Sequence, residues 1–187
     1  MSVTRLIRPA LEALEGYAAA LRAGWSPFNV GGEAVVRAHL EAIARDAESF
    51  LASLEDPEAR GGPITLPDGT RVPRLPSVTR WIWDGEFCGA IHLRWQPGTS
   101  ALPPHVLGHV GYAVVPWKRG QGHATRALAL LLPEARSVGL AHLDLTTDPE
   151  NIASQKVIIA NGGVALGRIR KDAAYGGEDA LLFRIAL

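Results

Sequence analysis

The stretch from Gly108 to Ala135 constrains the fold more than any other part of this 187-residue chain. Alternating side chains over 110–115 predict a β-strand, and Pro116 ends it because proline has no N–H for a strand ladder. A turn with two glycines follows, and apolar residues then recur at helical spacing over 124–135. The sequence therefore predicts a strand, a glycine turn and a helix in immediate succession.

This junction has the chemistry of an anion-binding site. The first turn of a helix carries unpaired backbone N–H groups and the positive end of the helix dipole. Gly120 and Gly122 let the backbone approach a phosphate closely, and Arg119 adds a positive charge. An ordinary tight turn is the alternative that these residues leave open. Two other phosphate-binding motifs are absent from the sequence, Gly-x-x-x-x-Gly-Lys-Ser/Thr and an early Gly-x-Gly-x-x-Gly.

The run Arg119-Gly120-Gln121-Gly122-His123-Ala124 resembles the Gln/Arg-x-x-Gly-x-Gly/Ala signature of the GNAT superfamily of acetyl-CoA-dependent N-acyltransferases. Tyr112 to Pro116 is similar to the fourth strand of that family. Downstream, Asp148 to Ser154 and Asn161-Gly162-Gly163 resemble the start and the end of the family's next helix. The ordered set extends over about 85–187 and is similar to a bacterial branch of predicted acetyltransferases.

The resemblance implies an α/β (α+β) fold in which helices flank a mixed, mostly antiparallel central sheet of six to seven strands. We expect one acyl-CoA N-acyltransferase domain over residues 1–187. Residues 1–76 would form a helical acceptor-side region and a loop, and residues 77–187 would form the sheet and the coenzyme A-binding core.

Local patterns predict the individual elements in chain order. They are a strand over 3–7, helices over about 9–23 and 32–54, strands over about 78–83, 86–95 and 108–115, the central helix from 124, a strand over 141–146, a helix that begins at Pro149 with Asp148 as its cap or at Ile152 with Asn151 as its cap and ends at 162–163, and strands over 164–169 and 181–187. The breaker-rich segment 55–77 predicts a long loop with a small hairpin about Asp68-Gly69. Pro133 predicts a kink or an early end of the central helix near Leu132.

The resemblance also implies how acetyl-CoA would bind. Its pyrophosphate would lie on the backbone N–H groups of 120–124, and its pantetheine arm would pair with the backbone of strand residues 112–114. Asn151 would bind the same arm, and Ser154 or Lys156 would reach the phosphates or the ribose; helix capping is the alternative for Asn151 and Ser154. The expected donor-binding residues are Tyr112, Ala113, Val114, Arg119, Gly120, Gln121, Gly122, His123, Ala124, Asn151, Ser154 and Lys156.

Transfer of an acyl group to an amine requires a neutral amine and a stabilised thiolate leaving group. His109 is a candidate base because histidine titrates near neutral pH, while a structural histidine and a water relay remain alternatives. Many members of the family carry a tyrosine seven residues after the helix-start asparagine, as the acid for the thiolate. Here that position is Ile158, so Tyr112 and Tyr175 are the nearest substitutes.

Composition excludes several other classes. The 19 basic and 19 acidic residues give a formal net charge of zero, which argues against a nucleic-acid partner. No apolar run is long enough to span a membrane. A single cysteine, Cys88, and no signal peptide predict a cytoplasmic protein. No His, Cys and Asp cluster has ligand spacing in the sequence, so we expect no metal.

The sequence thus predicts an acetyl-CoA-dependent N-acetyltransferase that acts by direct transfer in a ternary complex. The acceptor is a primary amine of unknown identity: a small amine, an amino acid or peptide N-terminus, or a lysine. Ile158 motivates the alternative of a non-catalytic acyl-CoA-binding sensor or partner module. A third reading is a nucleotide-binding protein that uses the glycine turn for ATP. Homodimers are common among similar proteins, so the resemblance also allows a homodimer.

Overall fold

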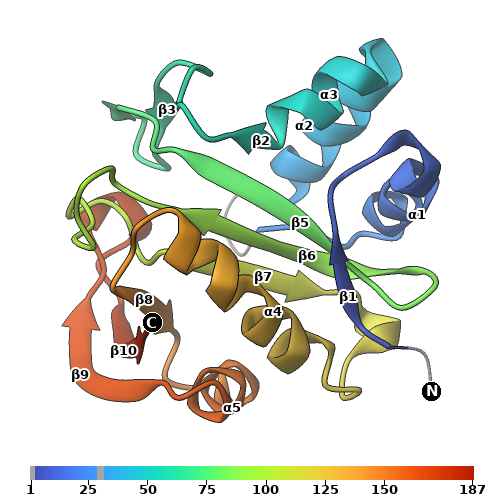
Figure 1. Cartoon of the computed structure of the whole chain (residues 1–187). Helices are drawn as coiled ribbons and strands as arrows, with labels where there is room; N and C mark the ends of the chain where they lie inside the picture. The colour runs from blue at the N-terminus through green and yellow to red at the C-terminus, as the bar shows by residue number, and fades with distance from the viewer. Residues whose placement is uncertain (1–2, 29–31) are drawn as a thin grey trace.

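The computed structural model describes residues 3–28 and 32–187 (Figure 1). Within them the elements are β1 (Arg5–Ile7), α1 (Leu11–Arg22), α2 (Gly32–Arg45), α3 (Ala47–Ser53), β2 (Glu55–Asp56), β3 (Ile64–Thr65), β4 (Arg71–Val72), β5 (Ser77–Trp83), β6 (Phe87–Arg94), β7 (Val110–Val114), a 3₁₀ turn (Pro116–Lys118), α4 (His123–Ser137), β8 (His142–Thr147), α5 (Ile152–Ala160), β9 (Val164–Arg170), a second 3₁₀ turn (Ala173–Tyr175) and β10 (Asp179–Ala186).

Two antiparallel sheets form the centre of the molecule. The first has the order β1-β5-β6-β7, with β2 also paired to β5, and the second has the order β8-β10-β9. β3 and β4 form a separate hairpin about the expected Asp68-Gly69 turn. The α/β fold with helices flanking mostly antiparallel strands is confirmed, although the strands divide between two main sheets.

The two sheets meet at one point, the start of β7. The His109 N–H donates to the Asp144 carbonyl over 2.8 Å, and the Asp144 N–H donates to His109 Nδ1 over 2.9 Å. Beyond this point β7 pairs with β6 on one edge, and no described strand pairs with its other edge. The Val114 carbonyl already accepts the Arg119 Nε–H over 3.1 Å, and the other backbone groups of that edge are available to a ligand.

Helices cover both faces of the first sheet (Figure 1). On one face, buried side chains of α4 such as Leu128 and Leu131 pack against Ile91 and its neighbours. On the other face α1 and α3 cover an aromatic cluster in which Tyr17 stacks on Trp81 with ring centroids 4.9 Å apart. Alternate residues of β5 and β6 supply the two cores, as the period of a strand requires.

Three helix boundaries differ from the first sequence expectation. α5 begins at Ile152 with Asn151 as its cap, so of the two expected starts the one at Asp148-Pro149 is wrong. The single helix expected over 32–54 is two helices, because Asp46 leaves the helical conformation and its side chain accepts the Ser49 N–H over 3.0 Å as the cap of α3. The central helix does not end near Leu132 but continues through Pro133 to Ser137. Burial of Leu131 and Ala135 on both sides of the proline keeps this turn packed on the sheet. Among the described residues, no helix is both long and apolar enough to cross a membrane.

Candidate functional site

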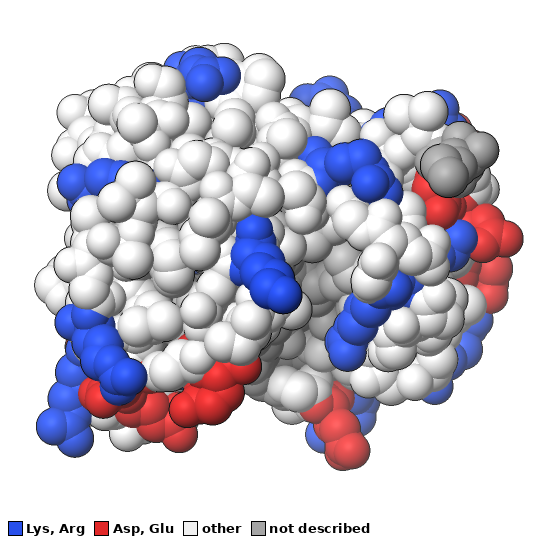
Figure 2. Space-filling model, turned by 90° about the horizontal axis from the view of Figure 1, so that it is seen from below, with Lys and Arg blue, Asp and Glu red and all other residues white. Residues whose placement is uncertain are grey.

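A cavity of about 690 Å³ opens between β7, the turn before α4 and the first turn of α5. Of the twelve expected donor-binding residues, all except Gln121 line it. Seen from below the view of Figure 1, basic side chains lie on both sides of a hollow in the surface (Figure 2). Three basic residues line the cavity. Lys118 and Arg119 come from the turn before α4, and Lys156 comes from α5 on the opposite side.

The turn before α4 presents a row of unused backbone donors. No backbone or side-chain acceptor among the described residues binds the N–H groups of residues 120–125; the first bonded one is that of Arg126, which donates to the Gly122 carbonyl over 3.1 Å. Gly120 and Gly122 have φ values of 73° and 77°, which favour glycine. A helix start with free donors and no intruding Cβ is suited to a phosphate group.

The first turn of α5 forms the opposite side of this cavity. The Asn151 side chain accepts the Ser154 N–H over 3.0 Å, so it caps α5 and leaves its amide N–H₂ group for a ligand. Ser154 and Lys156 also line the cavity, and the Lys156 side chain is exposed. Asn151 therefore caps α5, as the alternative interpretation expected, and this role is compatible with ligand binding through its amide N–H₂ group.

A second cavity, of about 660 Å³, lies on the other side of β7. The loop after α1, the β3–β4 hairpin, β6 and the second 3₁₀ turn contribute its walls, which include Phe28, Leu66, His92, Arg94 and Tyr175. Val110, Gly111 and Tyr112 of β7, with Thr146 of β8, line both cavities. The two spaces thus adjoin where β7 and β8 separate.

Tyr112 places a hydroxyl group at this junction. It shares a hydrogen bond of 2.7 Å with the Ser154 hydroxyl, which comes from α5 on the opposite side of the first cavity. Burial raises the pKa of Tyr112, so the phenol keeps its proton at neutral pH. Ile158, by contrast, is 1% exposed and belongs to the core, so it presents nothing to a ligand.

His109 has a structural setting. It is fully buried, it lines neither cavity, and its Nδ1 already accepts the Asp144 N–H. Burial lowers its pKa, which favours the neutral ring. This geometry supports a structural role for His109 rather than a role as the general base. Its hydrogen bonds with Asp144 join the two sheets at the start of β7.

His92 is the histidine that lines the second cavity. Its Nδ1 is 2.9 Å from the Thr79 hydroxyl and its Nε2 donates to the Pro27 carbonyl over 3.2 Å. Burial, with a smaller effect of Arg94, lowers its pKa to about 3. The neutral His92 ring therefore forms part of the cavity wall. Because both of its nitrogens are already hydrogen-bonded, it is a poor proton acceptor.

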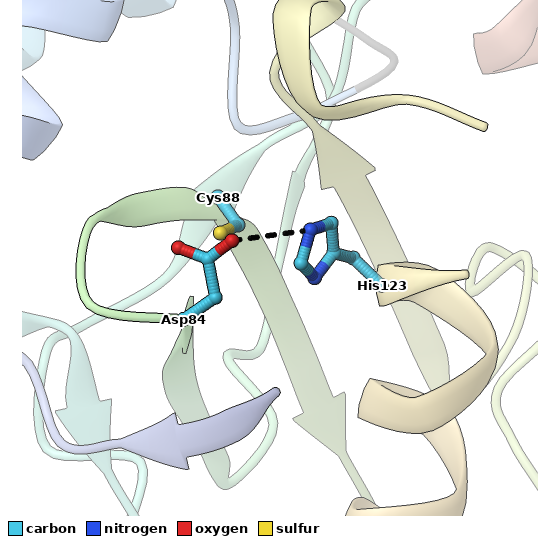
Figure 3. Close-up of side chains that lie close together, drawn as sticks. All are labelled: Asp84, Cys88 and His123. Atoms are coloured by element: carbon cyan, nitrogen blue, oxygen red, sulfur yellow. Dashed lines mark ion pairs between the residues drawn. The ribbon is translucent and has the colours of Figure 1, made fainter. Parts of the chain in front are cut away.

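The fold brings together a His/Cys/Asp group that spacing in the sequence does not predict. Asp84 and Cys88 of the β5–β6 hairpin face His123 at the start of α4, with their ligand atoms within 4.8 Å of one another (Figure 3). Lys118 already donates to both Asp84 carboxylate oxygens, over 3.2 and 3.1 Å. Burial raises the pKa of Cys88 to about 12, so the thiol stays protonated. We assign this cluster to anchoring α4 on the hairpin.

A family model described as the acetyltransferase (GNAT) family matches residues 38–159, more than half of the chain. The chain belongs to the GNAT acetyltransferase family. A comparison with curated proteins found no match.

Solved structures of GNAT acetyltransferases share the fold. The microcin C7 self-immunity acetyltransferase MccE, in complex with acetyl-CoA and AMP, has a TM-score of 0.61 at 14% identity, over 98% of this chain and 92% of that one. Mycobacterium smegmatis RimJ, in complex with CoA-disulfide, has a TM-score of 0.61 at 19% identity, over 99% and 82%. A Salmonella typhimurium acetyltransferase that modifies the N-terminal serine of ribosomal protein L7/L12 has a TM-score of 0.62 at 12% identity, over 100% and 96%. Identities this low show a common fold and nothing about the acceptor.

Proposed function

We propose that this GNAT family member is an acetyl-CoA-dependent N-acetyltransferase in which the amine attacks the thioester directly. The observation that carries the proposal is the junction of two cavities at Val110–Tyr112 and Thr146. A donor that enters from one side and an acceptor that enters from the other would meet there in a ternary complex. Holding two reactants in one geometry is itself a large part of catalysis.

The donor cavity fits the parts of acetyl-CoA in sequence. The free N–H groups of residues 120–125 and the side chains of Arg119 and Lys156 would bind the phosphates. The unpaired edge of β7 would bond the amides of the pantetheine arm as an added strand does. This arrangement leads the thioester toward Tyr112. That acetyl-CoA or CoA occupies MccE and RimJ supports the same use here.

The reaction needs one bond to form and one to break. The neutral amine nitrogen attacks the acetyl carbonyl carbon, and collapse of the tetrahedral intermediate breaks the carbon–sulfur bond. We assign to the Tyr112 hydroxyl the proton that the departing thiolate takes, with the Ser154 hydroxyl orienting it. No Asp or Glu lines the second cavity in the described chain, so water would carry away the amine's proton.

The second candidate is a non-catalytic acyl-CoA sensor, which buried Ile158 favours because the usual acid is missing. Release of free CoA thiol from acetyl-CoA, measured with a panel of amines, separates the two. The panel should include the N-terminal peptide of L7/L12, because the Salmonella relative acts on that protein. A ternary complex predicts intersecting double-reciprocal lines, whereas a covalent acetyl-enzyme predicts parallel ones. Acetyl-CoA binding without thiol release for any amine would support the sensor.

A further inference from the structure

Arg94 is the last residue of β6, and its side chain lies in the second cavity. Its backbone N–H donates to the His109 carbonyl over 2.9 Å, and its Nη2 atom lies 3.6 Å from the point that a Cβ of Gly111 would occupy. The guanidinium therefore lies within van der Waals distance of Gly111, which lines both cavities. The group faces the space assigned to the acceptor.

The Arg94 guanidinium has no partner among the described residues. It makes no hydrogen bond through its side chain and no ion pair with any described carboxylate. Arg80, the neighbouring arginine of the same sheet, is by contrast bound by Glu55 and Glu134. Arg94 is half-buried and keeps some contact with solvent, but a cation in a mostly apolar cavity without a counter-charge is still costly, and an anionic ligand would complete it.

The rest of the cavity offers nothing that would neutralise this charge. Its described lining consists of apolar and neutral groups, among them His92 in its uncharged form and the Tyr175 phenol. Burial lowers the pKa of Arg94, and the Tyr175 oxygen is the one group that opposes this shift. The cavity is therefore built around a single positive charge in apolar surroundings.

On the basis of the proposed acetyltransferase function, we infer that the acceptor amine carries an oxyanion, a carboxylate or a phosphate, that Arg94 binds in the second cavity. Arginine suits both groups because its planar fork can donate two parallel hydrogen bonds. The anion fixes one end of the acceptor at β6, so the amine at the other end can approach the thioester near Tyr112. A neutral amine of the same size lacks this anchor.

Matched pairs of small amines test the inference. The carboxylate pair is β-alanine and β-alaninamide, and the phosphate pair is phosphoethanolamine and ethanolamine. Binding of each to the CoA-saturated protein is measured by calorimetry, and turnover with acetyl-CoA is measured as thiol release. The variants are Arg94→Gln, Arg94→Lys and, as a matched control, Arg37→Gln on the exposed face of α2.

We expect the anionic member of at least one pair to bind the wild type and Arg37→Gln about tenfold or more tightly than its neutral partner. Arg94→Gln should abolish that preference, and Arg94→Lys should retain part of it. The pair that shows the preference identifies carboxylate or phosphate as the anion. Acetyl-CoA binding that is unchanged in Arg94→Gln shows an intact donor site.

Three results would overturn the inference: equal binding within both pairs, no binding of any member to the wild type, or an anion preference that persists in Arg94→Gln. Anion binding through Arg94 without any thiol release would leave the inference in place and contradict the proposed catalysis. The two failures are thus distinguishable.

Discussion

The Tyr112 hydroxyl lies where the two cavities adjoin, and hydrogen bonds to the Ser154 hydroxyl and carbonyl hold it there. In the proposed mechanism it supplies the proton that Ile158, in the core of α5, cannot donate. The acid would then come from the strand side of the donor cavity rather than from the helix side.

Tyr112→Phe removes the hydroxyl and keeps the ring. Loss of a general acid lowers rates by about 100-fold or more, but CoA is a tolerable leaving group, so we expect kcat to fall by roughly 10- to 100-fold. Acetyl-CoA affinity should change little, because the donor contacts of β7 are made by its backbone. Steady-state kinetics and calorimetry on the same preparation check both points. An unchanged kcat would contradict the role of Tyr112.

In the absence of a ligand, the unpaired Arg94 guanidinium should lower the protein's free energy of unfolding. Replacing an uncompensated, half-buried cation by a neutral side chain removes its partial desolvation cost, so Arg94→Gln should raise the free energy of unfolding by up to about 1 kcal/mol. Urea unfolding of the wild type and the variant, without ligand, measures this. A clear loss of stability in Arg94→Gln would mean that the guanidinium makes stabilising contacts and would weaken the inference drawn from its isolation.

At the scale of elements, the β6–β7 pair positions the floor of both cavities. Gly89 of β6 has a φ of 151°, and a Cβ there would overlap the carbonyl of Ala113 on β7. Gly89→Ala should therefore cost about 2 kcal/mol or more, since the strands must separate to admit the methyl group. Gly85→Ala is the matched control: its φ is 112°, but its Cβ meets nothing within 4 Å.

In Gly85→Ala the free energy of unfolding should fall by about 1–2 kcal/mol, because only backbone strain opposes the substitution. Chemical unfolding gives both free energies, and donor affinity should fall in Gly89→Ala alone. Equal losses in the two variants would show that the close approach of β6 and β7 carries no special cost.

Short-range signals in the sequence were sufficient to predict most elements. The Asp84-Gly85 turn and the glycines before α4 each act over a few residues and lie where the pattern predicts, and the Asn151 cap is one of the two starts that the pattern allowed for α5. The break at Asp46 was missed because apolar spacing continues across it, while a single side-chain cap decides it. Pro133 led to the opposite error: an end of the helix near Leu132 was predicted, but α4 continues because tertiary packing outweighs the local propensity of proline.

The donor side of the site was predictable because a contiguous motif, Arg119–Ala124, supplies much of it. The acceptor side was predictable only in outline, as a region within 1–76, because Phe28, Leu66, Arg94 and Tyr175 come from four distant segments that only the folded chain brings together. The same is true of the Asp84, Cys88 and His123 cluster. The sequence analysis named Tyr175 as a substitute acid, and Arg94 left a signal that it did not use, a charged residue at the end of an apolar strand.

At the scale of the whole molecule, buried neutral histidines make stability depend on pH. Burial lowers the pKa of His39, His92, His109 and His123 below the unfolded value of about 6.5. The unfolded chain therefore binds more protons below that pH, and stability is full above it and lost as the pH falls. For His92, with a pKa of about 3, the loss at pH 5 is about 2 kcal/mol.

Thermal unfolding between pH 8 and 5 should show a stability plateau above about pH 7 and a steep fall below it. His92→Gln provides the comparison, since it removes one of the titrating groups and should flatten the fall. Stability that stays constant to pH 5 would mean that these histidines are protonated in the folded protein.

Calorimetric titration of acetyl-CoA tests the central claim most directly, that the β7–α4–α5 cavity binds the acyl donor. The variants are Lys156→Glu, which reverses an exposed charge at the cavity, and Arg37→Glu, which reverses one on α2. We predict binding to the wild type and Arg37→Glu with equal affinity, and at least about tenfold weaker binding to Lys156→Glu. No binding to the wild type, or equal binding to all three proteins, would contradict the account.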